Sequence, residues 1–294
     1  MRQPTHVIGM IGIGQLGLPI AINLMRAGYR VIGFRRTDRD AFASAGGVAV
    51  ESPAEVARQA DVTLLCLPGP DVQHAVLTGP DGLLAALTPG KIVIDLGTYT
   101  REFKCEQARR LSELGVRTLE AEVSGSPPMV AQRQAALYVG GDEALFEECR
   151  PVLDAITAHH FHLGQIGSAV GMKLIANTLV AIHTLAAAEA MNLGMRAGFN
   201  PHRVAEVIRQ GAGNSAMFTL RAPFMAARTF TPAPGPFVTL HKYLLMGAQM
   251  AEDLGCATPL FSAAAPYFVR AVEGGMGDED IAAVIKLLEA DSIS

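Results

Sequence analysis

Gly12-Ile13-Gly14-Gln15-Leu16-Gly17 follows an apolar run at 7–11 and leads into an amphipathic stretch, 16–27, that is closed by Gly28. The run predicts a buried strand, and the stretch predicts a helix that ends at the glycine. Glycines at this spacing permit a tight turn and a close approach of a ligand to the backbone, while the helix N-terminus offers amide groups to phosphate. The segment therefore predicts a site for the pyrophosphate of a dinucleotide; a turn used only for packing is the alternative.

Short apolar runs alternate with helical stretches along the first half of the chain. Further strands are expected at 30–34, 62–67, 91–95, 117–119, 136–140 and 160–163, and helices at 53–59 and 101–114. Strands and helices that alternate at this length form a parallel sheet with helices on both faces. Residues 1–164 are therefore predicted to form an α/β domain with the doubly wound Rossmann arrangement.

The strand pattern stops after Gly164, and the remaining chain predicts helices joined by turns rich in glycine and proline. Residues 168–197 lack proline and are apolar around much of their circumference, which predicts one helix about 45 Å long at roughly 1.5 Å per residue. Residues 165–294 are therefore predicted to form an all-helical second domain. Its apolar surface exceeds what one small domain can cover, which predicts a homodimer or homotetramer built through this half.

Composition limits the classes of function. The formal net charge is −4, and no block of lysine or arginine is present, so nucleic acid is not an expected partner. The apolar N-terminal stretch, 7–25, contains four glycines, a proline and polar residues, which favours a strand, turn and helix over a membrane span or signal peptide. A cytoplasmic protein without a membrane partner is expected.

Cysteine and histidine offer no metal site. The four cysteines lie far apart without CxxC spacing, which is typical of reduced thiols. His159, His160 and His162 are not joined by a carboxylate or cysteine at a recognisable ligand spacing, and alternation of two of them suits the end of a strand. No metal is predicted.

The second strand ends in Phe34-Arg35-Arg36-Thr37, where an acidic residue would normally accept the ribose hydroxyls of NAD. Arginine suits the 2′-phosphate of NADP because its planar fork donates two charge-assisted hydrogen bonds, and Thr37 could add a hydroxyl. The pattern predicts NADP(H) rather than NAD(H). A pair of solvated arginines at a strand end is the alternative.

Four motifs resemble those of the β-hydroxyacid dehydrogenase family, which includes 3-hydroxyisobutyrate dehydrogenase and the glyoxylate/succinic semialdehyde reductases. They are Gly12-x-Gly-x-x-Gly-Leu-Pro-Ile-Ala-x-Asn-Leu24, Leu67-Pro68, Glu122-Val-Ser-Gly-Ser126 and Gly164-x-x-Gly-x-x-x-x-Met-Lys173-x-x-x-Asn177. The resemblance spans nearly the whole chain. It implies a helical second domain, dimers or tetramers, and an active site in the cleft between the domains.

The resemblance also implies roles for individual residues. Lys173 becomes the catalytic residue and Asn177 its partner, and an i,i+4 spacing puts both on one helix face. Ser124, Gly125, Ser126, Thr98 and Tyr243 become candidates for binding substrate, with Ser124 and Gly125 anchoring its carboxylate. The cofactor candidates are Gly12, Ile13, Gly14, Gln15, Leu16, Arg35, Arg36, Thr37, Leu67, Pro68, Thr98 and Lys242.

A lysine in the first turns of a helix feels the positive end of the dipole, which lowers its pKa towards a range useful for proton transfer. For Lys173 this predicts proton exchange with the substrate oxygen during NADP-dependent oxidation of a β-hydroxy acid, or reduction of its semialdehyde or keto form. Three readings of the chain stay open at this point. The alternatives to this enzyme are an imine reductase, which usually has another residue at this position, and a catalytically silent dinucleotide-binding protein with a surface lysine.

The chain departs from the family pattern at four positions. Glu122 stands where proline is usual, Tyr243 where aspartate is usual, Gly97 where serine is usual and Gly235 where phenylalanine is frequent. Together these changes predict an altered substrate pocket beside an intact cofactor site. The sequence does not identify the substrate.

Overall fold

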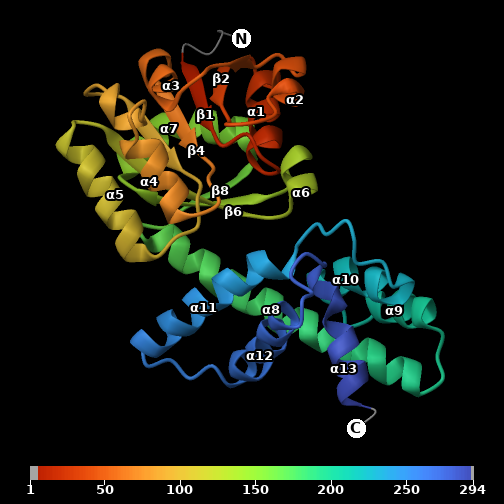
Figure 1. The fold of residues 1–294 in the computed structure, drawn as a ribbon. Helices are drawn as coiled ribbons and strands as arrows, with labels where there is room; N and C mark the ends of the chain where they lie inside the picture. Colours follow the sequence, from red (N-terminus) through yellow and green to blue (C-terminus); the bar gives the residue numbers. More distant parts are fainter. Residues whose placement is uncertain (1–5, 293–294) are drawn as a thin grey trace. The chain divides into compact units, whose positions relative to one another are not determined.

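Two compact units make up the chain in the computed structural model, which describes residues 6–292 (Figure 1). The first unit ends at Lys173 and the second begins at Leu174, within helix α8 (Ser168–Arg196). The division therefore falls later than the boundary predicted after residue 164. The first turns of α8 belong to the first unit because they bind its sheet: the backbone amide of Ala169 donates a hydrogen bond to Glu120 at 2.8 Å.

An eight-stranded sheet organises the first unit, in the order β3-β2-β1-β4-β5-β6-β7-β8. The strands are β1 (Val7–Ile11), β2 (Arg30–Phe34), β3 (Val48–Ala49), β4 (Val62–Leu65), β5 (Ile92–Asp95), β6 (Arg117–Ser124), β7 (Ala136–Gly141) and β8 (His159–His162). The order reverses direction at β1, whose neighbours are β2 and β4. This reversal is the topological switch point at which doubly wound sheets bind ligands.

One strand pair corrects the prediction of a parallel sheet. β6 and β7 are antiparallel, whereas the other paired strands run parallel. They are joined only by a short connection that contains α6 (Pro127–Ala131), which reverses the chain without the long crossover that a parallel pair needs. β6 also continues to Ser124, beyond the predicted end at 119, because it buries two charged residues that the apolar pattern excluded from a strand.

Two apolar layers enclose the sheet. Ile8, Met10 and Leu64 belong to one core cluster, and Ile11 and Leu65 belong to another, as expected when successive side chains point to opposite faces. The surrounding helices are α1 (Gly17–Arg26), α2 (Asp40–Ser44), α3 (Pro53–Gln59), α4 (Pro70–Thr78), α5 (Arg101–Glu113), α6 and α7 (Glu143–Ile156), with a short 3-10 helix η1 (Leu83–Ala85). The predicted doubly wound fold is confirmed.

Apart from one isolated bridge between Pro236 and Asp280, the regular secondary structure in the described residues of the second unit is helical. It comprises the rest of α8 with α9 (Pro201–Arg209), α10 (Ala216–Ala227), α11 (Phe237–Asp253), α12 (Pro259–Glu273), the 3-10 helix η2 (Ile281–Val284) and α13 (Ile285–Asp291). Its core gathers residues from most of these helices, including Met191, Phe237 and Phe268. By length and composition α8 could cross a membrane, but 44% of its most apolar window is buried within the protein. The buried face of α8 forms part of this core.

Candidate functional site

The turn between β1 and α1 has a geometry that requires glycine at two positions. Gly12 has φ +94°, and a Cβ there would lie 2.1 Å from the carbonyl oxygen of Cys66; a Cβ at Gly17 would lie 2.0 Å from the carbonyl oxygen of Gly12. A Cβ at Gly14 would meet nothing within 4 Å. The outer glycines therefore serve the fold, whereas Gly14 leaves open space through which a pyrophosphate can approach.

The same turn lies at the switch point of the sheet. The amide of Gly12 donates to the carbonyl oxygen of Phe34 at the end of β2, and the amide of Cys66 after β4 donates to that of Ile11. Gln15 is exposed, Leu16 is half-buried and Ile13 packs into the core. No side chain caps the N-terminus of α1, so its first amides face the turn without a side-chain acceptor. This arrangement fits the phosphates of a dinucleotide.

The two arginines that follow β2, Arg35 and Arg36, differ in exposure and in their contacts. Arg35 is half-buried, and its Nη1 donates to the carbonyl oxygen of Ile13 at 3.1 Å, which brings the guanidinium back to the glycine turn. Arg36 and Thr37 are exposed. Arg39, which the sequence analysis missed, holds the loop by donating to the carbonyl oxygen of Arg35 at 2.7 Å. Arg36 is therefore the more accessible cation, and Arg35 is anchored to the turn.

The loops after β4 and β5 are tied together beside the glycine turn. The hydroxyl of Tyr99 donates to the carbonyl oxygen of Leu67 at 3.0 Å, and Pro68 next to it is exposed. A Cβ at Gly97 would lie 2.4 Å from the ring of Tyr99. Gly97 therefore replaces the serine usual in the family because the Tyr99 ring occupies the space that a serine side chain needs.

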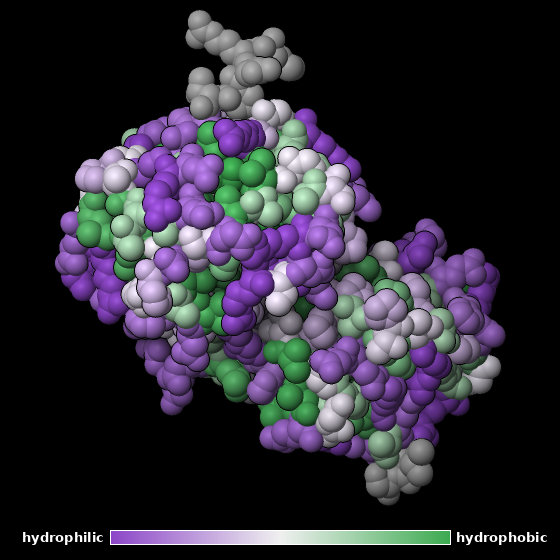
Figure 2. Space-filling view, turned by 45° about the horizontal axis from the view of Figure 1, so that its top comes forward, coloured by the Kyte–Doolittle hydropathy of each residue, from purple (hydrophilic) through white to green (hydrophobic). Residues whose placement is uncertain are grey.

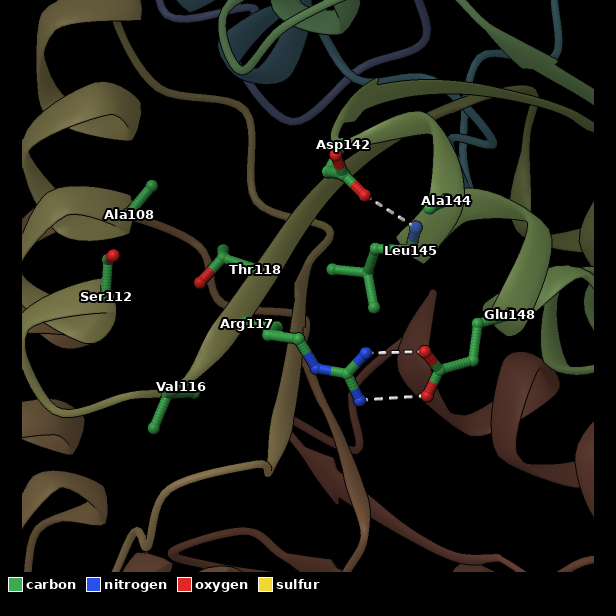
Figure 3. A pocket seen from close by; sticks show the side chains of 9 residues that line it. All are labelled: Ala108, Ser112, Val116, Arg117, Thr118, Asp142, Ala144, Leu145 and Glu148. Atoms are coloured by element: carbon green, nitrogen blue, oxygen red, sulfur yellow. Dashed lines mark hydrogen bonds and ion pairs between the residues drawn. The ribbon is translucent and has the colours of Figure 1, made fainter.

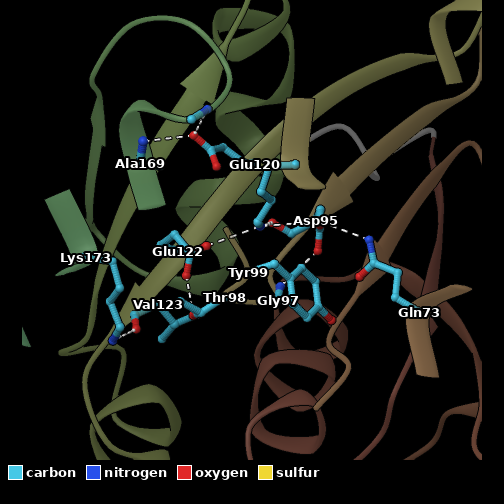
Figure 4. Close-up of polar contacts among 12 residues, drawn as sticks. Gln73, Asp95, Gly97, Thr98, Tyr99, Glu120, Glu122, Val123, Ala169 and Lys173 are labelled. Carbon is cyan, nitrogen blue, oxygen red and sulfur yellow. Dashed lines mark hydrogen bonds and ion pairs between the residues drawn. The ribbon is translucent and has the colours of Figure 1, made fainter. Parts of the chain in front are cut away.

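Lys173 is buried at the start of α8, and its Nζ donates to the carbonyl oxygen of Val123 at 2.5 Å (Figure 4). Burial lowers the pKa of Lys173 below its usual range, and the negative charge of Glu122 partly opposes this shift. Burial, rather than the helix dipole invoked from sequence, is thus the leading cause of the lowered pKa. Because Val123 directly precedes Ser124, the fold brings the predicted catalytic lysine to the predicted carboxylate anchor.

The remaining predicted residues lie on both units. Ser124 and Ser126 are half-buried and Gly125 is exposed at the end of β6. Asn177 follows Lys173 by one turn of α8; it is buried, and among the described residues its Nδ2 has no hydrogen-bond acceptor. In the second unit, the Lys242 Nζ lies 6.0 Å from the centroid of the Tyr243 ring on α11.

A row of buried charges along β5 and β6 was missed by the sequence analysis (Figure 4). Glu120 and Glu122 point to the same face because they are two residues apart on a strand, and Asp95 is the register partner of Glu120. Each of these three residues is at most 5% exposed. We call Asp95, Glu120 and Glu122 the acidic row.

Lys104 of α5 neutralises part of the acidic row. Its Nζ lies 3.3 Å from Oδ2 of Asp95 and 3.2 Å from Oε1 of Glu122. Burial favours the neutral amine, but the charges of the acidic row outweigh it and raise the pKa of Lys104. The spacing of Lys104, Gln107 and Leu111 places all three on the buried face of α5, which is the signal in the sequence that could have found this lysine.

The two glutamates hold different partners. Glu120 accepts hydrogen bonds from the amides of Gly167 and Ala169, at 2.6 and 2.8 Å, and so caps the N-terminus of α8. A Cβ at Gly140 on β7 would lie 2.5 Å from Oε1 of Glu120, so only glycine leaves room for it. Glu122 accepts a hydrogen bond from the hydroxyl of Thr98 at 2.5 Å. Burial raises the pKa of both glutamates, and Lys104 opposes the rise.

A surface hollow at the other end of β6 is separate from these residues (Figure 3). Arg117, the first residue of β6, forms a bidentate ion pair with Glu148 of α7 across it. None of the predicted site residues lines this hollow. The candidate site lies instead at the carboxyl end of β6. This end is about 20 Å from Arg117 along the eight-residue strand.

The fold and the glycine turn are those of a dinucleotide-binding protein, and comparison with known proteins agrees. Residues 7–164 match the family model of the NAD-binding domain of 6-phosphogluconate dehydrogenase. Residues 167–288 match the model described as the NAD-binding domain of NADP-dependent 3-hydroxyisobutyrate dehydrogenase. The chain belongs to the β-hydroxyacid dehydrogenase family, as its motifs predicted.

Individual relatives cover nearly the whole chain. L-threonate dehydrogenase from Cupriavidus necator is 37% identical over 283 residues, 95% of each protein. The chloroplastic glyoxylate/succinic semialdehyde reductase 2 of Arabidopsis thaliana is 31% identical over 97% of this chain and 80% of its own length. A crystal structure of 3-hydroxyisobutyrate dehydrogenase from Salmonella typhimurium superimposes with a TM-score of 0.87 at 31% identity, covering 95% of this chain and 99% of that one. These relatives support oxidoreduction of small hydroxy acids.

Proposed function

We propose that this protein is an NADP(H)-dependent enzyme that interconverts a β-hydroxy acid and its semialdehyde or keto form, with Lys173 as the proton-transfer residue. The observation that carries the proposal is the buried Lys173 amine, held at 2.5 Å from the carbonyl oxygen of Val123, one residue before Ser124. A buried amine with a lowered pKa is suited to exchange a proton near neutral pH.

Lys173 would take the proton of the substrate hydroxyl during oxidation and return it during reduction. The carbonyl of Val123 accepts a hydrogen bond from this amine and so directs it towards the residue that precedes Ser124. The buried Nδ2 of Asn177 lacks an acceptor among the described residues, and such a donor costs free energy unless a ligand satisfies it. A substrate oxygen that accepts a hydrogen bond from Asn177 would do so.

Ser124 and Gly125 would anchor the substrate carboxylate. The Ser124 side chain supplies a hydroxyl donor and the exposed Gly125 supplies a backbone amide, both at the end of the strand that Lys173 contacts. An anchored carboxylate fixes the distance from the acid group to the reacting carbon. This distance would select a hydroxyl on the carbon that the amine of Lys173 can reach.

The residues around the glycine turn fit a dinucleotide. Gly14 leaves space for the pyrophosphate, the first amides of α1 face it, and Leu67 and Pro68 lie on the neighbouring loop. When bound, the nicotinamide accepts or donates the hydride of the reaction. Arg36 is exposed and Arg35 is anchored to the turn, so their charges favour the 2′-phosphate of NADP(H).

We also propose that the second unit forms a homodimer or homotetramer. Its exposed apolar side chains include Ile175, Leu179, Leu193, Leu245 and Leu260, each at least half exposed. Apolar patches interrupt the polar surface in the space-filling view (Figure 2). An exposed apolar surface of this kind is typical of an interface.

A turnover assay tests the proposed reaction. Purified protein is incubated with NADP⁺ and a panel of hydroxy acids that includes L-threonate, glycerate and 3-hydroxyisobutyrate, and formation of reduced nicotinamide is followed by absorbance. We expect turnover with at least one of them and its loss in Lys173→Ala. Turnover of cyclic imines but of no hydroxy acid would instead support an imine reductase. Binding of NADP(H) without any turnover would support a catalytically silent dinucleotide-binding protein.

A further inference from the structure

Thr98 and Glu122 form one of the shortest polar contacts in the first unit. The Thr98 hydroxyl oxygen lies 2.5 Å from Oε2 of Glu122, and both residues are buried. Hydrogen bonds of about 2.5–2.7 Å are characteristic of a hydroxyl that donates to an ionised carboxylate. In this bond the Thr98 hydroxyl donates and the Glu122 carboxylate accepts.

Lys104 supports the ionised form of Glu122. Its Nζ lies 3.2 Å from the other carboxylate oxygen, Oε1, and 3.3 Å from Asp95. The charged groups that face Glu122 are Lys104 from α5, Asp95 from β5, Lys173 from α8 and Glu120 on its own strand. Burial raises the pKa of Glu122, and Lys104 opposes this rise most strongly.

Asp95, a member of the acidic row, holds the backbone next to Thr98. Oδ1 of Asp95 accepts a hydrogen bond from the amide of Gly97 at 2.9 Å, and Gln73 donates to Oδ2 at 3.1 Å. Thr98 thus has a fixed backbone and a fixed hydroxyl direction. A hydroxyl carries one proton and two lone pairs, so a threonine that gives its proton to Glu122 offers only acceptor capacity to anything else.

We propose that Glu122 is a positioning residue that keeps Thr98 as an acceptor, so that the site selects a ligand presenting an N–H or O–H donor to the Thr98 oxygen. The inference rests on the proposed function and on the place beside cofactor and substrate that the family resemblance implies for Thr98. Two sources carry this donor: the carboxamide of the nicotinamide, and a second hydroxyl on the carbon beside the substrate carboxylate. The proline usual at position 122 in the family has no side-chain acceptor and could not impose this direction.

Two matched ligand pairs test the proposal by equilibrium calorimetry. The first pair is NADP⁺ and its analogue with an acetyl group in place of the carboxamide, which lacks the N–H donor. The second pair is glycerate and 3-hydroxypropanoate, bound to the NADPH-loaded enzyme, in which no hydride acceptor is present; these acids differ only by the hydroxyl on the carbon beside the carboxylate. Because each arm measures binding, neither depends on turnover, and failure of the proposed reaction remains distinguishable from failure of this inference.

Variants separate Glu122 from its surroundings. Glu122→Met removes the acceptor and leaves Lys104 paired with Asp95 at 3.3 Å, so that neither of these buried charges loses its partner. Glu122→Gln is the second variant, since its amide can donate to Thr98 and release the threonine proton. Glu120→Gln is the matched control, because Glu120 lies on the same strand face and does not contact Thr98. Thermal unfolding establishes that each variant is folded.

The wild-type protein is expected to bind the donor-bearing member of at least one pair about ten- to a hundredfold more tightly than the other member. The reason is that a ligand without the donor leaves the buried Thr98 oxygen without a hydrogen-bond partner. The pair that discriminates identifies the source of the donor. This preference should fall to within about threefold in the folded Glu122 variants and persist in Glu120→Gln. Equal binding within both pairs by the wild-type protein, or an unchanged preference in the Glu122 variants, would overturn the proposal.

Discussion

The amine of Lys173 and the carbonyl oxygen of Val123 lie 2.5 Å apart in a buried setting, which ties the first turns of α8 to the carboxyl end of β6. This hydrogen bond leaves the lysine beside Ser124 and within the field of Glu122. The orientation and pKa of the amine are therefore set by contacts made across the fold.

Removing this amine should abolish proton transfer while sparing cofactor binding. Lys173→Ala is expected to lower kcat by about 10²–10⁴-fold, the usual span of general acid–base catalysis, with little change in the Kd of NADP(H). Steady-state kinetics and a fluorescence titration measure the two quantities. Lys286→Ala, which alters a partly exposed ion pair with Glu279 in the second unit, is the control and should retain activity. A near-normal kcat in Lys173→Ala would remove this residue from the mechanism.

The pH dependence should report the lowered pKa of Lys173. Oxidation needs the neutral amine, so its rate should rise with pH through an apparent pKa below that of a solvated lysine, and reduction should fall over the same range. The charge of Glu122 raises this pKa, so Glu122→Gln should move the oxidation limb to still lower pH. A limb at the pH of a free lysine, or a shift to higher pH in the variant, would contradict this assignment.

Cofactor preference should depend on Arg36. We expect a higher kcat/KM with NADP(H) than with NAD(H), and Arg36→Asp should weaken NADP(H) selectively because it replaces a cation by an anion near the 2′-phosphate. Arg30→Asp is a matched control, since Arg30 is exposed at the opposite end of the same strand. Equal or better efficiency of the unmodified enzyme with NAD(H) would show that these arginines do not select the cofactor.

The apolar surface of the second unit should mediate assembly. Light scattering at micromolar concentration is expected to give a dimer or tetramer, and Leu179→Glu together with Leu245→Glu should shift it towards the monomer. Both leucines are at least half exposed on helices of this unit. Leu114→Glu, at an exposed site in the first unit, should leave the mass unchanged. A monomeric wild-type protein would exclude this surface as an interface.

A buried ion pair in the second unit should matter more for stability than an exposed one. Arg221 and Asp280 lie 2.5 Å apart and are almost fully buried, and Asp280 also accepts from the amide of Gly235. Arg221→Ala is expected to lower the free energy of unfolding by about 3–5 kcal/mol, because it leaves a buried carboxylate unpaired. Arg270→Ala, which breaks an exposed pair with Asp291, should cost about 0–1 kcal/mol. Denaturant unfolding compares them, and equal losses would refute the distinction.

Gly235 illustrates how one of the departures from the family pattern is explained only in three dimensions. A Cβ at this position would lie 2.7 Å from a guanidinium nitrogen of Arg221. The guanidinium therefore occupies space that a larger side chain at 235 would need. The glycine at 235 thus leaves room for the buried ion pair of Arg221 with Asp280, although the three residues are far apart in the sequence.

The sequence alone determined the features that depend on neighbouring residues. The glycine turn, the strand before it and the helix after it are local, since turn geometry and apolar periodicity act over a few residues. The same holds for the alternation that predicted the sheet and for the 168–196 helix. The spacing of Lys173 and Asn177 on one helix face was also predictable, because helical periodicity alone sets it.

Tertiary structure decided what distant residues do to one another. The antiparallel pairing of β6 with β7 followed from the short connection, and the acidic row with Lys104 became visible only when β5, β6 and α5 were brought together. A sequence pattern predicts that the charged residues Glu120 and Glu122 lie on the surface. They are buried in this fold because Lys104, Thr98 and the amides at the start of α8 supply their partners. The free energy of a buried charge depends on those long-range partners, and no local pattern encodes them.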